Sequence, residues 1–199
     1  MNNSNHGKVR RLVTLALLTA LVVVLQTLGS FLTIGSTPIS LTLVPIVIGA
    51  IILGPGAGAF LGAVFGIVAL SAGFTGKDWF TNMLLNLNPF WTIVVCMAKG
   101  MLAGAVAGWI AKALKKNVTL GCILAALAAP IVNTGVFALG MMTVLRPELN
   151  GFTGTVGGTD AIQTLFLVLI GVNFLIELAV NAALSAAIAR IVKAVARMD

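Results

Sequence analysis

Residues 89–113 read PFWTIVVCMAKGMLAGAVAGWIAKA, an apolar run with a single charged residue, Lys99, in its interior. A helix of this length can cross the roughly 30 Å hydrocarbon core of a bilayer at about 1.5 Å per residue. Lys99 lies ten residues beyond Pro89, which places it about 15 Å along the helix and close to the membrane midplane. The run therefore predicts a membrane-spanning helix with a charge at its centre.

The rest of the chain has the composition of an integral membrane protein. Of its 199 residues, 59% are hydrophobic and only 9% are charged, whereas a soluble domain carries about a quarter charged residues. The length accommodates about six spans of roughly 20 residues each. We expect an all-α integral membrane protein, a compact bundle of six transmembrane helices that forms a single domain over residues 1–199 behind a short cytoplasmic tail at 1–9.

Glycine, proline and polar stretches separate the six predicted spans. The spans run approximately over Leu12–Thr33, Ser40–Leu53, Ala59–Ala72, Pro89–Ala113, Leu120–Leu145 and Ala161–Val195. The connections are expected at Gly35–Pro38, Gly54–Gly58, Gly73–Leu87 and Arg146–Asp160. The last two are predicted to be outer loops, and the stretch at Gly54–Gly58 a tight cytoplasmic turn.

Glycines recur at a spacing of four in two of the predicted spans. They are Gly58, Gly62 and Gly66 near the third span, and Gly100, Gly104 and Gly108 in the fourth. This spacing leaves one helix face without side chains, which lets a neighbouring helix approach closely. The pattern predicts a close contact between helices.

Basic residues are placed asymmetrically around the spans. The net charge is +7, and nine of the twelve basic residues form three flanking clusters: Lys8, Arg10 and Arg11; Lys112, Lys115 and Lys116; Arg190, Lys193 and Arg197. In a six-span arrangement all three clusters fall on one side, as the positive-inside rule requires of a cytoplasmic face. We therefore expect both termini inside a bacterial plasma membrane, with the lipid bilayer rather than nucleic acid as the partner of these charges.

Glu177 is the second charge predicted to lie at membrane depth. Asn173 and Asn181 flank it at a spacing of four, so the three side chains share one helical face. Because a central Lys or Glu costs roughly 2.5–3.5 kcal/mol to insert, Lys99 and Glu177 need each other, water or a ligand as partners. Three interpretations stay open: an ion pair that joins two helices, a pocket that binds a small solute, and a proton-coupling role in which Glu177 titrates.

Further polar and aromatic residues are candidates for the same site. Asn133 lies in the fifth span, while Asn86 and Asn88 lie either at a pocket entrance or at a helix start as capping residues. Trp79 lies in an outer loop and is suited to a lid or to an interfacial anchor. The predicted substrate-binding set is Lys99, Glu177, Asn173, Asn133, Asn86, Asn88 and Trp79.

Residue types needed for catalysis are scarce. The chain has one histidine and no acidic cluster with metal-ligand spacing. The glycine-rich stretch at 54–58 lacks the Lys-Ser/Thr pair of a phosphate-binding P-loop. We expect a protein that is not an enzyme and that binds no metal and no cofactor, so any energy for active transport comes from another subunit.

Several short motifs resemble those of the substrate-binding (S) components of energy-coupling factor (ECF) transporters. The first is Ala16-Leu17-Leu18-Thr19-Ala20, an Ala-x-x-x-Ala motif in the first span. The others are Ile39-Ser40-Leu41, Pro45-Ile46-Val47-Ile48-Gly49-Ala50, Leu53-Gly54-Pro55-Gly56-Ala57-Gly58, Asn88-Pro89, Lys99-Gly100 and Asn173-Phe174-Leu175-Ile176-Glu177-Leu178. Together they extend over most of the chain.

The resemblance implies a function and a set of partners. An S component captures a vitamin or related micronutrient at the outer face and delivers it to a module of one transmembrane coupling subunit and two ATPase subunits, which use the ATP. Ala16 and Ala20 would dock on the coupling subunit, and which vitamin is bound stays open. Two alternatives remain: a self-sufficient proton-coupled carrier or channel in which Glu177 titrates, and a membrane subunit that transports nothing and whose charge pair is architectural.

Overall fold

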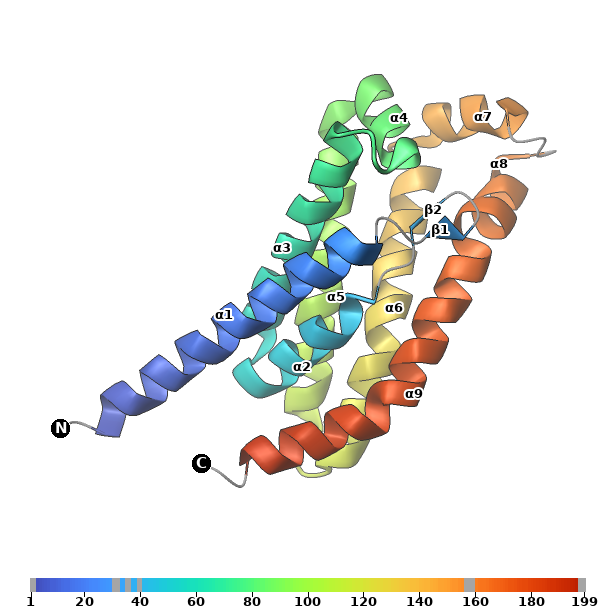
Figure 1. The fold of residues 1–199 in the computed structure, drawn as a ribbon. Coiled ribbons are helices and arrows are strands. Elements are labelled where there is room, and N and C mark those ends of the chain that lie inside the picture. Colours follow the sequence, from blue (N-terminus) through green and yellow to red (C-terminus); the bar gives the residue numbers. More distant parts are fainter. Residues whose placement is uncertain (1–2, 30–32, 35–36, 39–40, 156–159, 197–199) are drawn as a thin grey trace.

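The computed structural model describes residues 3–29, 33–34, 37–38, 41–155 and 160–196, and these form a bundle of helices (Figure 1). In this described part, five helices are long and apolar enough to cross a membrane. They are α1 (Asn3–Gly29), α3 (Pro55–Phe74), α5 (Pro89–Ala113), α6 (Val118–Met142) and α9 (Gly171–Ala196). The prediction of an all-α fold with long apolar helices is confirmed.

Shorter elements connect these helices. They are the strands β1 (Thr33–Ile34) and β2 (Thr37–Pro38), which pair antiparallel, the helices α2 (Leu43–Leu53), α4 (Trp79–Leu87), α7 (Arg146–Thr155) and α8 (Ala161–Gln163), and a π-helical stretch, η1 (Thr164–Ile170). Helix α2 occupies the predicted second span but has 11 residues, or about 16 Å of helix. A count of six spans therefore stays a prediction.

Side-chain caps fix where several helices begin. Asn88 Oδ1 accepts a hydrogen bond from Trp91 N at 3.4 Å, directly before Pro89 in the first turn of α5. Asn117 Oδ1 accepts one from Leu120 N at 3.2 Å at the start of α6. Such caps satisfy backbone N–H groups that have no partner within the helix.

Helices α3 and α5 meet along a glycine seam, which we define as Gly58, Gly62, Gly100 and Gly104. A Cβ at Gly62 would collide with the backbone carbonyl of Gly100, and a Cβ at Gly104 with that of Gly58. The seam continues at Gly66, where a Cβ would lie 2.9 Å from the carbonyl oxygen of Cys96. The close helix contact predicted from the glycine spacing is confirmed.

The two predicted outer loops contain helices, which corrects the sequence interpretation. In 73–87, α4 buries Phe80, Leu84 and Leu85 on one side and turns Asn86 outward. In 146–160, α7 likewise buries Leu149 and Phe152 in the core. Polar residues made both stretches look like loops, yet each has an apolar face that packs on the long helices.

Element boundaries also differ from the predicted ones. Helix α1 already begins at Asn3, inside the segment predicted as a tail. The predicted glycine-rich turn at 54–58 reduces to Gly54, with φ 97°, because Pro55 starts α3. The predicted last span is divided into α8, η1 and α9.

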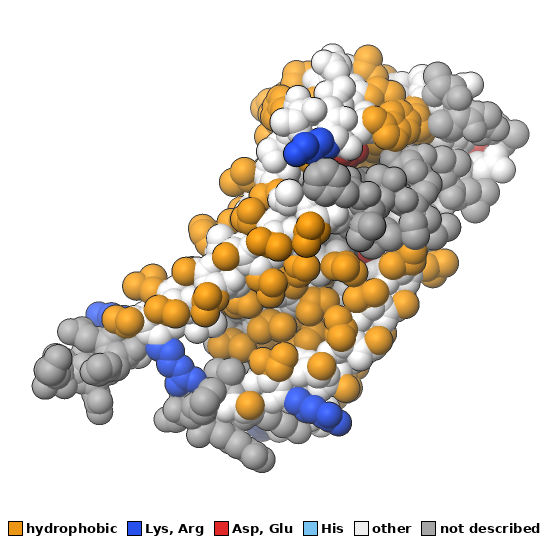
Figure 2. Space-filling model, viewed as in Figure 1, with side chains coloured by type: hydrophobic (Ala, Val, Ile, Leu, Met, Phe, Trp, Pro, Cys, Tyr) orange, Lys and Arg blue, Asp and Glu red, His pale blue; other side chains and the backbone are white. Residues whose placement is uncertain are grey.

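The bundle has two distinct ends. Both termini and the α2–α3 and α5–α6 connections lie at one end, which we call the basal end, and α4 and α7 lie at the opposite, apical end (Figure 1). The face shown in Figure 2 carries most of its blue basic side chains at the basal end and orange apolar side chains along the helices. The basic clusters thus gather on one end, whichever side of a membrane that end faces.

Candidate functional site

One cavity of about 100 Å³ brings together side chains from six α-helices and the π-helical η1. We call it the apical pocket. Its lining residues are Gln26 on α1; Phe65 and Ala69 on α3; Phe80 and Thr81 on α4, with Asp78 just before it; Lys99 on α5; Asn133, Thr134 and Phe137 on α6; Ile170 at the end of η1; and Asn173, Phe174 and Glu177 on α9.

Lys99 lies between two aromatic rings of this pocket. Its Nζ is 5.6 Å from the ring centroid of Phe65 and 5.3 Å from that of Phe137. Both distances are within the roughly 6 Å at which a cation is attracted to the face of a ring. The electron-rich faces of the two rings therefore attract the ammonium group and hold it at the pocket wall.

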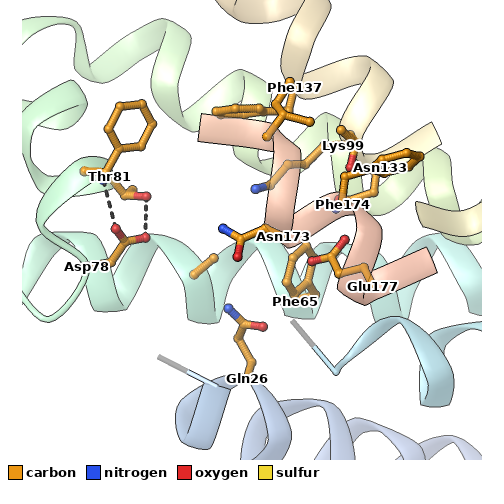
Figure 3. Close-up of a pocket in the computed structure, with 14 residues that line it drawn as sticks. Gln26, Phe65, Asp78, Thr81, Lys99, Asn133, Phe137, Asn173, Phe174 and Glu177 are labelled. Carbon is orange, nitrogen blue, oxygen red and sulfur yellow. Dashed lines mark hydrogen bonds between the residues drawn. The ribbon is translucent and has the colours of Figure 1, made fainter. Parts of the chain in front are cut away.

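Glu177 and Asn173 lie one turn apart on α9 and face the same pocket. The Glu177 side chain is only 6% exposed. Figure 3 shows the polar ends of Lys99, Asn173, Gln26 and Glu177 converging on one space from different helices. The pocket thus places a positive charge, a negative charge and two amides around a single small volume.

Asn133 supplies an acceptor to the same wall. Its Oδ1 atom is buried and has no hydrogen-bond partner among the described residues. A buried acceptor without a donor costs about 1–3 kcal/mol, so such atoms are usually satisfied by water or by a ligand. Asn133 is therefore placed to accept a hydrogen bond from a donor inside the pocket.

Gln26 is the residue of α1 that lines the pocket, and it is hydrogen-bonded to the start of α2. Thr42 Oγ1 donates a hydrogen bond to Gln26 Oε1 at 2.9 Å, and both side chains are buried. Because Thr42 directly precedes α2, this bond fixes α1 against the start of α2. It also orients the Gln26 amide at the pocket edge.

Asp78 and Thr81 close the apical side of the pocket. Thr81 donates to Asp78 twice, from its backbone N at 3.1 Å and from its Oγ1 at 2.6 Å (Figure 3). The first of these bonds makes Asp78 the N-cap of α4. Helix N–H groups at this position attract a negative charge. The start of α4 is thereby held against the pocket.

Four of the seven predicted binding residues line the apical pocket, namely Lys99, Asn133, Asn173 and Glu177. The other three lie outside its lining. Trp79 is 48% exposed and contacts Phe152, with the two ring centroids 5.7 Å apart. Asn86 Nδ2 donates to Asn82 O at 3.0 Å, and Asn88 Nδ2 donates to Glu148 Oε1 at 3.0 Å.

The two residues predicted to dock a partner lie away from the pocket. Ala16 and Ala20 are both exposed on α1, one turn apart. They therefore share one helix face that the bundle does not cover.

Several lining residues were missed by the sequence analysis. Gln26 had a usable signal, since it is a lone amide within the apolar residues of α1. Phe65, Phe80, Phe137 and Phe174 had none, because an aromatic residue in an apolar helix is equally suited to a core or to lipid. Only the tertiary arrangement shows which faces of these helices surround the pocket.

This set of side chains is suited to binding rather than to covalent chemistry. It combines a cation, a carboxylate and amides with aromatic faces, so the cavity offers both polar and apolar contacts to a small solute. Among the described residues, no group of three or more His, Cys, Asp or Glu side chains could hold a metal ion.

Comparison with known proteins adds one match. Residues 10–189 match the family model described as "ECF transporter, substrate-specific component". No curated protein matches the chain.

Proposed function

This chain belongs to the family of ECF transporter substrate-specific components, and on that premise we propose that it binds a vitamin or related micronutrient in the apical pocket. It then delivers this ligand through an ECF transmembrane coupling subunit that works with two ATPase subunits. ATP is used by those partners, and this chain contributes recognition of the substrate without a cofactor of its own.

The observation that carries the proposal is the convergence of buried polar groups inside an apolar bundle. Lys99, Asn133 and Glu177 come from three different helices and line one cavity. Ionisable groups are expensive at membrane depth unless a partner or a water-filled site receives them. A polar ligand in this cavity can be contacted by all three side chains.

The distribution of charge supports an orientation. Lys112, Lys115 and Arg11 lie near connections at the basal end, while the pocket is lined at the apical end by Thr81 on α4 and by Asp78 just before it. If the basic end is cytoplasmic, the pocket lies on the outer side of the bundle, behind the start of α4. Both termini are then cytoplasmic in a bacterial plasma membrane, and α2 belongs to a sixth crossing.

The ligand can be identified directly. We expect detergent-solubilised protein, purified without added ligand, to release a small molecule that mass spectrometry assigns to the vitamins or their precursors. The compound should rebind to the emptied protein in isothermal titration calorimetry. Purified protein that releases no such compound and binds none of a vitamin panel would contradict the proposal and support a purely architectural charge pair.

Lys99→Ala and Glu177→Gln test the pocket assignment. Each removes a charge that lines the cavity, so we expect the Kd for the identified ligand to rise tenfold or more with the folded yield retained. Lys116→Ala and Asp160→Asn are matched controls, since both side chains are exposed and neither lines the pocket. Normal binding by both pocket variants would show that the site is assigned wrongly.

A proton-coupled carrier remains the alternative, and one observation favours it. Glu177, Asn181 and Ser185 form a buried row along α9, as a proton path would require. Uptake into cells distinguishes the two mechanisms when the proton gradient is collapsed and ATP is preserved. Under our proposal uptake continues, whereas uptake that stops with the gradient identifies the carrier.

A further inference from the structure

A second cavity, of about 360 Å³, lies at the basal end between five of the helices. We call it the basal pocket. It is lined by the end of α2 and the turn into α3, by the end of α5, by the start of α6 and by α9: Ala50, Ile51, Ile52, Leu53, Gly54, Pro55, Gly108, Ala111, Lys112, Lys115, Val118, Gly121, Cys122 and Val192.

The lining of the basal pocket divides into an apolar and a cationic part. Ile51, Ile52 and Val192 contribute apolar side chains. Lys112 is an exposed basic residue in the last turn of α5, and Lys115 is an exposed basic residue in the turn that follows. No acidic side chain in the described part of the chain lines this cavity. Among the described residues that line the cavity, the two lysines therefore give a positive charge that no acidic lining side chain offsets.

Arg11 adds a third cation beside the basal pocket. Its Nη2 donates a hydrogen bond of 2.7 Å to the carbonyl oxygen of Leu53. Leu53 is the last residue of α2, where helix carbonyls lack partners within the helix. The hydrogen bond from Arg11 therefore offsets the partial negative charge at the end of α2. With this charge offset, the two lysines remain available to an anion.

The depth of the basal pocket matches the headgroup region of a bilayer. Trp109, next to the lining residue Gly108, is 58% exposed, and tryptophan is enriched where lipid meets water. Lys112 and Lys115 follow within two turns and can extend toward headgroups while their aliphatic chains stay on apolar surface. A ligand of this pocket would therefore be an amphiphile with its charge at the interface.

We propose that the basal pocket binds one anionic phospholipid. Lys112 and Lys115 pair with its phosphate, and an acyl chain lies along Ile51, Ile52 and Val192. Basic pockets between membrane helices recognise anionic headgroups by this combination of charge and apolar surface. This site is separate from the apical pocket and does not depend on which solute that pocket binds.

Lipid titration followed by native mass spectrometry tests the proposal. Purified full-length protein is titrated with dioleoylphosphatidylglycerol and, separately, with zwitterionic dioleoylphosphatidylcholine. We expect the first bound lipid to be at least tenfold tighter for the anionic species. The double variant Lys112→Gln/Lys115→Gln should reduce this preference to twofold or less, because the phosphate loses both cations.

The matched control removes the same charge at the same end of the molecule. Lys116→Gln/Arg190→Gln alters two exposed basic residues that do not line the pocket, and it should keep the preference. Ala111→Leu retains all charges but fills the apolar part, so it should also weaken the first lipid. Equal losses in the two double variants, no preference in the unaltered protein, or displacement of the lipid by millimolar glycerol phosphate would each overturn the proposal.

Discussion

At the scale of the residue, Asn133 destabilises the empty protein but is placed to bind a ligand. Its Oδ1 is buried without a hydrogen-bond partner among the described residues, in the wall of the apical pocket. Asn181 has the same deficit at its own Oδ1, but it lies outside the pocket lining, and its Nδ2 donates to the carbonyl of Glu177 at 2.9 Å. The two asparagines therefore allow a matched comparison.

Asn133→Leu should stabilise the empty protein and weaken its binding. The change removes a buried unsatisfied acceptor that costs about 1–3 kcal/mol of folding stability. The Tm of the ligand-free protein should therefore stay level or rise. The Kd for the ligand should increase about tenfold, because the ligand loses a hydrogen bond. Thermal unfolding and calorimetric titration measure the two effects on the same samples.

Asn181→Leu is the comparison variant, since it alters an equally buried amide that does not reach the cavity. We expect its Kd to stay within about threefold of the Kd of the unaltered protein. This is well below the tenfold change, equal to about 1.4 kcal/mol of binding free energy, that is expected for Asn133→Leu. A loss of binding as large as that of Asn133→Leu would show that the two asparagines act through the packing of helices rather than through contact with the ligand.

The polar residues of the pocket could be predicted from the sequence because they lie in apolar segments. A charge or amide inside a span needs a partner, so Lys99, Asn133 and Glu177 could be selected from the sequence alone. Asn88 did not need a partner in a pocket, because backbone N–H groups at a helix start can satisfy its side chain. In the structure it caps α5. The phenylalanines of the pocket could not be selected, since their burial depends on neighbours that only the fold defines.

At the scale of the element, the glycine seam determines the distance between α3 and α5. Both helices contribute to the apical pocket, through Phe65 and through Lys99. The contact between them is backbone against backbone, so no flexible side chain can move aside to accept a larger residue. The geometry of Lys99 over the Phe65 ring therefore depends on the seam.

Gly62→Ala should destabilise the protein and weaken binding together. Its methyl group would collide with the Gly100 carbonyl, and overpacking of this kind costs about 1–3 kcal/mol. At roughly 2–4 °C per kcal/mol, the Tm should fall by several degrees. A Kd increase should accompany it, because Phe65 and Lys99 are moved apart.

Gly135→Ala is the control for this substitution. A Cβ at Gly135 meets nothing within 4 Å, and alanine favours a helix interior by about 1 kcal/mol over glycine. Its Tm should therefore stay level or rise. If Gly62→Ala behaves in the same way, the seam does not set the helix spacing.

The sequence predicted the long helices better than the short ones. A long span such as α5 repeats its apolar and glycine pattern over many turns, and that repetition identifies it. Helices α4 and α7 are short and polar on one side, so their sequences are similar to those of loops. Their helical state follows from Leu84 and Leu149 packing into the core, which is tertiary information.

At the scale of the whole molecule, α1 is the least embedded of the long helices. Only 17% of its apolar window is buried in the bundle, and Ala16 and Ala20 lie on its uncovered surface. A face of small residues allows another membrane helix to approach closely. We therefore assign docking on the coupling subunit to this face, as part of the proposed function.

Ala16→Trp and Ala20→Trp should each abolish ATP-driven uptake while leaving the Kd for the ligand unchanged. The added indole prevents close approach of a partner helix, but it lies away from the apical pocket. Uptake is measured in cells that produce the complete transporter, and the Kd is measured on the isolated chain.

Leu17→Trp controls for bulk alone. Leu17 is 68% exposed, and it lies about 100° around the helix from Ala16. Uptake should persist in this variant. Uptake that survives both alanine substitutions would refute docking on this face.

The shared location of the two termini could be predicted, whereas the predicted count of six crossings stays a prediction. The clustering of basic residues predicted that the termini and the α5–α6 connection share one end, and they do. Helix α2 is shorter than a membrane span, and its flanking residues 39–40 lie outside the described part of the chain. A count of crossings therefore needs a topology measurement.

The glycine seam also has a consequence for how such a protein can diverge. Substitution at Gly62 or Gly100 is blocked by backbone on the opposite helix, so these positions admit almost no variation. Lys99 lies next to Gly100 on α5 but lines the cavity, where a new side chain meets the ligand and other side chains. Phe65 lines the same cavity, yet its ring also packs against Gly100. We therefore expect substitutions at Lys99 to change the preferred solute without altering the helix contact, whereas a change at Phe65 also alters the contact with the seam.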